Sequence, residues 1–264
     1  MLVDEIRAYV ALGDSFTEGL NDPGVMGEFR GWADRLAEYI ERAQPGLRYA
    51  NLAVRGKLLG QIADEQVPVA VGMRPDLVSI SAGGNDMLRP GADPDVIAAR
   101  FYAAARELRG SGAEVLVFTG FDPALRSVNG RASARWRGKV ATLNVHLRSI
   151  ADRLDLRVVD LWSMPELCDD GAWDEDRLHM TPEGHRRLAV AIAEFLDVPT
   201  GEEWRGEWPE RVVLPWREAK QADLHWARTY LLPWVQRRIK GRSSGDGRVA
   251  KRPELAPVLT DHDR

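Results

Sequence analysis

Short apolar stretches alternate with longer amphipathic stretches along most of the chain. The short stretches are rich in Val, Ile and Leu and are bounded by Gly or polar residues, which predicts buried strands at 7–12, 47–52, 77–82, 114–120 and 156–161. Apolar residues recur at helical spacing in the segments between them, which predicts helices at 32–43, 58–73, 95–109 and 132–155. A last helix is predicted after Thr181, an N-cap residue followed by Pro182.

This alternation of strand and helix predicts an α/β fold. Parallel strands need long crossover connections, and both faces of their sheet must be covered, so we expect a mainly parallel sheet with helices on each side. Ligands of such sheets bind beyond the carboxyl ends of the strands. The alternation of strands and helices predicts a single domain formed by residues 1–200.

The residues from 201 to 264 differ in character and are expected to form a C-terminal extension. One helix is predicted at 217–239 with a kink near Pro233, and the sequence GRSSGDGR that follows is typical of a flexible linker. The final stretch is expected to be disordered. Five of the nine tryptophans lie in the extension: Trp204, Trp208, Trp216, Trp226 and Trp234. We expect them to pack the extension against the core, with a lid or a partner surface as the alternative.

Charge gives no indication of a nucleic-acid partner. The formal net charge is −4, whereas binding to a phosphate backbone requires a clustered cationic surface. The segment 237–252 contains seven basic residues and one acidic residue. This segment could contact an anionic membrane surface or an acidic protein, although a solvated tail is the simpler interpretation.

Cysteine content and hydropathy favour a cytoplasmic protein. Cys168 is the only cysteine, so no intrachain disulfide can form, and a reducing compartment fits. Charged residues precede the first apolar run, which is also too short for a secretory signal. Since no stretch of about twenty uncharged apolar residues occurs, we expect no transmembrane segment.

The strongest candidate for chemistry is a serine at the end of the first predicted strand. Ser15 follows Gly13 and Asp14 there, at the edge of the sheet where ligands are expected. A serine hydroxyl needs a base to remove its proton, and that base needs a third group to fix its tautomer. His179 and Asp176 lie three residues apart in a loop after the fifth strand, so we expect them to activate Ser15.

Acyl transfer also requires hydrogen-bond donors for the oxyanion. Gly56 follows the second predicted strand, where the missing side chain would let its backbone N–H approach a substrate oxygen. Asn85 follows the third strand in a Gly-Gly-Asn-Asp sequence, and its amide can donate directly. The four candidate elements therefore all follow separate strands.

Three rival sites have weaker support. The sequence of 241–245 matches the G-x-S-x-G nucleophile elbow, but that motif must lie between a strand and a helix, and here it follows a helix. The acidic surroundings of Cys168 would raise its thiol pKa, which argues against a catalytic thiol. His185 lies in the predicted helix after His179, so these residues with Asp176 are not expected to bind a metal, and no cofactor is predicted.

The blocks GDS at 13–15, Gly56, GGND at 83–86 and DRLH at 176–179 resemble the four blocks of the SGNH hydrolases, the GDSL-type esterases and lipases. The resemblance covers about residues 6–197 and implies a flavodoxin-like three-layer sandwich with a five-stranded parallel sheet. It implies Ser15 as nucleophile and Asp176 with His179 as the rest of the triad. The oxyanion hole would combine the backbone N–H groups of Ser15 and Gly56 with the Asn85 side chain.

The predicted activity is hydrolysis of a small or lipid-like carboxylic ester through an acyl-enzyme. An acyltransferase or a thioesterase on the same scaffold remains an alternative, as does a catalytically silent protein that binds a partner through its extension. The small-molecule ester is expected to contact Asp14, Phe16 and Asp86, which are the chain neighbours of Ser15 and Asn85.

Overall fold

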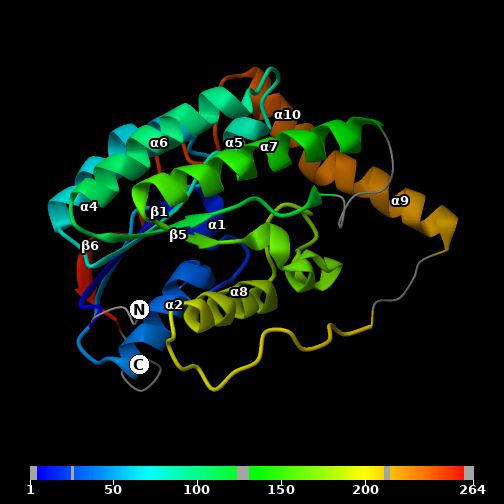
Figure 1. Ribbon diagram of the computed structural model, residues 1–264. Helices are drawn as coiled ribbons and strands as arrows, with labels where there is room; N and C mark the ends of the chain where they lie inside the picture. Colours follow the sequence, from blue (N-terminus) through cyan, green and yellow to red (C-terminus); the bar gives the residue numbers. More distant parts are fainter. Residues whose placement is uncertain (1–4, 25–26, 124–130, 211–214, 259–264) are drawn as a thin grey trace.

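The computed structural model describes residues 5–24, 27–123, 131–210 and 215–258, and its centre is one six-stranded sheet (Figure 1). The strand order is β5-β4-β3-β1-β2-β6. The strands are β1 (Ala8–Gly13), β2 (Arg48–Asn51), β3 (Leu77–Ser81), β4 (Glu114–Phe118), β5 (Arg157–Val159) and β6 (Arg252–Pro257). The pairs among β1 to β5 are all parallel, so the sequence predicted these five strands correctly.

The five-stranded sheet of the prediction is one strand too small. β6 pairs antiparallel with β2, with Arg48 opposite Pro257 and a bulge between Tyr49 and Asn51. The prediction of a disordered final stretch is therefore wrong for residues 252–257, while residues 259–264 lie outside the described part of the chain. Because β6 belongs to the central sheet, the sheet extends across the predicted boundary at residue 200.

Helices cover both faces of the sheet, as expected for a three-layer sandwich. One layer holds α2 (Gly31–Ala43) and α8 (Pro182–Phe195), which pack on the face that carries Tyr9 and Ala11. The other layer packs on Val10 and Leu12, the alternate residues of β1. Its elements are α3 (Leu59–Gln61), η1 (Ile62–Gln66), α4 (Val67–Met73), α6 (Pro94–Gly110) and α7 (Arg131–Leu154).

Short helices follow the carboxyl ends of the strands. α1 (Ser15–Glu18) directly follows β1, and α5 (Gly84–Met87) follows β3. After β5 come η3 (Leu161–Ser163), η4 (Pro165–Cys168) and η5 (Asp170–Ala172). α8 begins as predicted, with the Thr181 hydroxyl accepting a bond from the Gly184 N–H at 3.1 Å. Since β1 lies between β2 and β3, loops from both sides of β1 meet at this edge.

The predicted helix of the extension is present and has a wide turn in its middle. α9 (Trp216–Trp226) continues into the π-helical turn η6 (Ala227–Leu231) and then α10 (Leu232–Ile239). Pro233 lacks an N–H and its ring would crowd the preceding turn, which explains a wider turn at this point. Among the tryptophans of the extension, Trp204 is buried and Trp208 packs on the same core cluster, whereas Trp216 is 69% exposed.

Residues 241–248 are not a free linker, contrary to the prediction. The Asp246 carboxylate accepts a bond from the Ser243 N–H at 2.8 Å, and Gly245 is buried against the backbone oxygen of Arg55. At least one side chain of the basic segment 237–252 is also buried in the protein. The Lys251 ammonium donates to the carbonyl oxygens of Glu18, Phe29 and Arg30 and pairs with Asp34.

Candidate active site

Ser15, His179 and Asp176 form a continuous chain of hydrogen bonds at the carboxyl end of the sheet. Ser15 Oγ lies 2.9 Å from His179 Nε2, and His179 Nδ1 lies 2.6 Å from Asp176 Oδ2. The side chains of His179 and Asp176 are 16% and 17% exposed, so the pair is sheltered but reachable from solvent. The structure thus brings together the three residues that the sequence predicted as a triad.

Local backbone bonds explain why the three-residue spacing of Asp176 and His179 works. Asp176 Oδ1 accepts from the N–H groups of both Leu178 and His179 at 2.9 Å, which closes a tight turn around the carboxylate. Arg177 has φ 58°, so the chain reverses within the turn. The second carboxylate oxygen is left to face the imidazole ring, as a triad requires.

The electrostatics of the turn keep Asp176 ionised. Burial alone would raise the pKa of this carboxyl, but the bonds from the ring and backbone of His179 and from the Leu178 N–H lower it to about 2. Asn21 adds a donor to the same carboxylate, with Nδ2 at 3.0 Å from Asp176 Oδ2. A permanent anion beside Nδ1 fixes the tautomer in which Nε2 can accept a proton from Ser15.

Asn85, one of the three predicted oxyanion donors, is bonded to the residue that follows Gly56, another of them. Asn85 Nδ2 donates to the carbonyl oxygen of Lys57, the neighbour of Gly56, at 3.1 Å. The same amide donates to Asp14 Oδ2 at 2.9 Å, next to Ser15. Gly56 has φ +74°, a left-handed conformation that favours glycine. The loops after β1, β2 and β3 are therefore connected around Ser15.

The three residues predicted to contact the substrate all contact other groups of the protein. Asp14 is buried and caps α1 through the Phe16 N–H, and burial raises the pKa of its carboxyl to about 6. Asp86 accepts from the Leu59 N–H at 2.9 Å. The Phe16 ring contacts Trp32, Phe118 and Phe121. These contacts explain how the three residues shape the loops, and contact with substrate stays a prediction for each of them.

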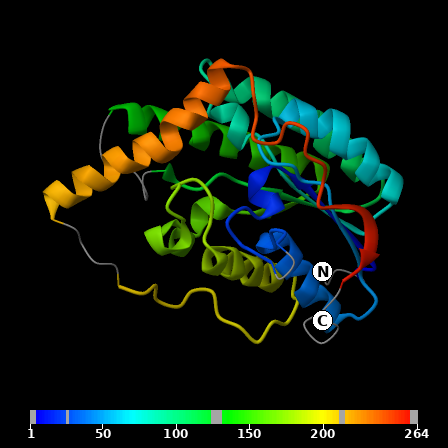
Figure 2. The same ribbon diagram turned by 180° about the vertical axis from the view of Figure 1, so that it is seen from behind.

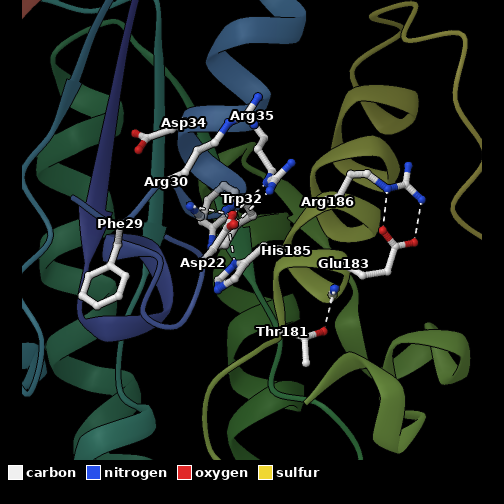
Figure 3. A network of polar contacts seen from close by, with 12 residues as sticks. Asp22, Phe29, Arg30, Trp32, Asp34, Arg35, Thr181, Glu183, His185 and Arg186 are labelled. Atoms are coloured by element: carbon white, nitrogen blue, oxygen red, sulfur yellow. Dashed lines mark hydrogen bonds and ion pairs between the residues drawn. The ribbon is translucent and has the colours of Figure 1, made fainter. Parts of the chain in front are cut away.

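His185 is buried in α8, and both of its ring nitrogens contact backbone groups (Figure 3). Its Nδ1 accepts from the Trp32 N–H at 3.2 Å and its Nε2 lies 3.1 Å from the Leu20 carbonyl oxygen. Burial lowers the pKa of this imidazole to about 4, so the ring is neutral. Asp22 accepts from Arg35 and from the Gly31 N–H nearby, which fixes the loop after α1 against α2.

The sequence assigned no catalytic role to three residues that contact the loops around Ser15, although it predicted that Glu18 and Asn21 line the entrance of the site. Asn21 holds Asp176, and Glu18 accepts bonds from the backbone and side chain of Arg55, beside Gly56. Trp226 of the extension donates from Nε1 to the backbone oxygen of Asp176 at 3.0 Å. Each contact joins residues far apart in sequence, and no local motif marks such residues.

Other classes of site have no support in the described residues. No group of three or more His, Cys, Asp or Glu side chains there is placed to hold a metal ion. Within the same residues, no helix has the length and apolar character needed to cross a membrane. Cys168 is buried in η4.

Comparison with known proteins agrees with this geometry. The model of the GDSL-like lipase/acylhydrolase family matches residues 11–187, which include all the candidate active-site residues named from the four blocks. The chain belongs to this family. It is therefore an ester-hydrolysing enzyme of the GDSL type, and the resemblance seen in the sequence is confirmed.

Similar proteins include one curated relative and several solved esterases. The GDSL esterase/lipase WDL1 of Oryza sativa subsp. japonica is 24% identical over 191 residues, which are 66% of this chain and 72% of WDL1. The acetylxylan esterase Axe2 of Geobacillus stearothermophilus has TM-score 0.61 and 20% identity, covering 77% of this chain and 98% of Axe2. The esterase EstA of Pseudoalteromonas sp. has TM-score 0.57 and 14% identity, covering 72% and 97%. These likenesses show the GDSL fold.

Proposed function

We propose that this GDSL-type enzyme is a serine esterase that works through an acyl-enzyme. The observation that carries the proposal is the hydrogen-bonded chain from Ser15 through His179 to Asp176, with distances of 2.9 and 2.6 Å. Ser15 Oγ attacks the carbonyl carbon of the ester while its proton passes to His179 Nε2. The imidazolium then gives that proton to the departing alcohol, and the acyl group stays on Ser15.

The second half of the reaction uses the same groups in reverse. A water molecule attacks the acyl-enzyme as His179 Nε2 takes its proton, and the acid leaves when Ser15 Oγ regains a proton. The oxyanion of each step would be held by the backbone N–H groups of Ser15 and Gly56 and by the Asn85 amide. Both hydrogens of that amide have protein acceptors, Asp14 and Lys57, so the amide must turn toward the oxyanion as it forms.

The substrate is proposed to be a small or lipid-like carboxylic ester. Two of the similar solved structures are described as acetyl xylan esterases, which adds acetylated sugars to the esters worth testing. Residues 1–200 carry the proposed catalytic and oxyanion residues, in line with the predicted hydrolase domain. An acyltransferase or a thioesterase would use the same acyl-enzyme and differ only in the acceptor or the leaving group.

Hydrolysis of p-nitrophenyl esters from acetate to palmitate, with acetylated xylose alongside, tests the proposal. Replacing Ser15 by Ala should lower kcat/KM by about four to six orders of magnitude, because the nucleophile is lost, with no change in Tm. Ser111→Ala, on the C-cap of α6, is a matched control that should keep full activity. Equal turnover in wild type and Ser15→Ala would remove Ser15 from the mechanism, and product diverted to added alcohols would indicate a transferase.

A further inference from the structure

The C-terminal extension contacts loops on both sides of Ser15. Its residues 216–251, which we call the strap, run from α9 through α10 and then down to β6 (Figure 2). Near one end, Trp226 Nε1 donates to the backbone oxygen of Asp176, within the turn that carries His179. Near the other end, Ser243 lies against Gly56 in the loop after β2. The strap therefore connects the acid–base loop with the oxyanion loop.

The contact at the acid–base loop involves several groups. Arg177 forms an ion pair with Asp223 of α9 at 2.7 Å, and its guanidinium lies 4.9 Å from the centre of the Trp226 ring. Tyr230 lies with its hydroxyl 3.4 Å from Glu175. Arg177 is the residue with positive φ inside the Asp176–His179 turn. The strap thus holds the turn by its backbone and by the side chain at its most constrained position.

The contact at the oxyanion loop is close enough to leave no space for a side chain. A Cβ atom at Gly56 would overlap Ser243 Oγ, and one at Gly245 would overlap the backbone oxygen of Arg55. The turn that presents Ser243 is itself fixed, since its N–H donates to Asp246 and its Oγ accepts from the Gly245 N–H at 3.2 Å. Residues 243–245 therefore define the position of the Arg55–Gly56 peptide.

The far end of the strap is anchored beside the nucleophile. Lys251 is only 9% exposed in its side chain and donates to the backbone oxygen of Glu18, the last residue of the helix that Ser15 begins. Glu18 in turn accepts bonds from Arg55. The strap and α1 thus both contact the Arg55–Gly56 segment of the oxyanion loop.

We propose that Trp226 and Ser243 are positioning residues of the esterase, which hold the His179 turn and the Gly56 N–H in register across Ser15. This inference rests on the proposed serine mechanism for its kinetic consequences. The oxyanion and the imidazolium exist only along the reaction path, so loosening either loop should lower kcat more than it changes KM. The extension is then part of the active site and not a separate binding module.

Two conservative variants with matched controls test the proposal. Trp226→Phe removes the N–H that reaches Asp176 and keeps a smaller aromatic ring, and Trp216→Phe makes the same change at an exposed position of α9. Ser243→Ala removes the hydroxyl at Gly56, and Val249→Ala trims an 87% exposed residue of the same segment. We expect Trp226→Phe and Ser243→Ala each to lower kcat about five- to tenfold with KM within twofold, because one good hydrogen bond is at stake, and both controls to match wild type.

Hydrogen exchange separates failure of this inference from failure of the proposed function. Amides of 54–57 should exchange faster in Ser243→Ala, and amides of 176–179 faster in Trp226→Phe, whether or not the wild type hydrolyses any ester tested. If the wild type is active through Ser15 but both variants keep its kcat, the positioning role is overturned. Unchanged exchange in both loops would overturn the contact on which that role depends, even in an enzyme without detected substrate.

Discussion

At the scale of single residues, the site depends on how Asp176 is held. Its two oxygens receive bonds from the backbone of its own turn, from the His179 ring and from Asn21, and these bonds keep the pKa of the carboxyl at about 2. The carboxylate is therefore a permanent anion throughout the pH range of ordinary enzymes. In the proposed mechanism this carboxylate orients the imidazole and stabilises the imidazolium that forms.

Asn21 should contribute to catalysis through this carboxylate. Asn21→Gly removes the amide but tolerates the backbone, which has φ 68° at this position, and should lower kcat/KM about tenfold because a bond to a charged group is lost. Asn21→Ala loses the same bond and adds backbone strain, so it should also lower Tm. The two variants are compared by steady-state kinetics and thermal unfolding. Full activity in Asn21→Gly would show that Asn21 does not orient the triad.

The sequence predicted the candidate catalytic residues that follow strands, but not the contacts that hold them from other parts of the chain. Ser15, Asn85 and His179 stand in short motifs whose positions follow from the order of strands and helices. Asn21 and Trp226 act through contacts across 155 and 50 positions of the chain. No periodicity or local spacing encodes such contacts, because they depend on how separate elements pack.

At the scale of elements, the strands and crossover helices were predictable and β6 was not. β1 to β5 are short apolar runs between helices of regular spacing, so buried positions mark them clearly. β6 contains Pro253 and Pro257 and has no buried residue within its bounds. Proline in a strand is tolerated only where its missing N–H needs no partner, as at the edge of a sheet. A polar, proline-containing strand has the local pattern of a loop.

The buried His185 of α8 should make stability depend on pH. The pKa of its imidazole is about 4 in the folded state and about 6.5 in an unfolded chain. The contribution of the neutral ring to the free energy of unfolding is therefore full above pH 6.5 and is lost as the pH falls toward 4. The loss is up to about 3 kcal/mol, since each unit of pKa corresponds to about 1.4 kcal/mol. Asp14 acts in the opposite direction, because its raised pKa of about 6 means that protonation favours the folded state.

Urea unfolding at pH 7.5 and pH 5 of wild type and His185→Gln isolates this contribution from that of Asp14. The variant should be less stable than wild type at pH 7.5, since its side chain cannot reproduce both ring contacts, but should lose less stability on going to pH 5. Parallel pH dependences in the two proteins would show that His185 is not the group that titrates.

At the scale of the whole molecule, Lys251 anchors the extension to the core. Lys251 donates to three backbone carbonyls and pairs with Asp34, far from its own position in the chain. The segment before β6 is thereby joined to residues 18–34 of the core. The same observation weakens a membrane role for the basic segment 237–252, because one of its charges is already neutralised inside the protein.

Lys251→Met should destabilise the whole molecule. The substitution keeps the apolar stem but leaves the Asp34 carboxylate without its cation, which typically costs about 3–5 kcal/mol for a buried pair. For a chain of this size we expect Tm to fall by roughly 6–20 °C. Lys240→Met, at an exposed position, is the matched control and should keep the wild-type Tm. A Tm of Lys251→Met within about 1 °C of wild type would contradict the anchoring role.

The position of β6 also has a consequence for biosynthesis. All the proposed catalytic and oxyanion residues are synthesised before β6: Ser15, Gly56, Asn85, Asp176 and His179. Arg48 of β2, however, can pair with Pro257 of β6 only after that strand has been synthesised. Until β6 has been synthesised, the backbone groups on this edge of β2 have no partner strand. Unpaired strand edges of this kind make partly folded chains prone to aggregation. A polypeptide that already contains every proposed catalytic residue therefore still lacks the partner strand of β2 until β6 has been synthesised.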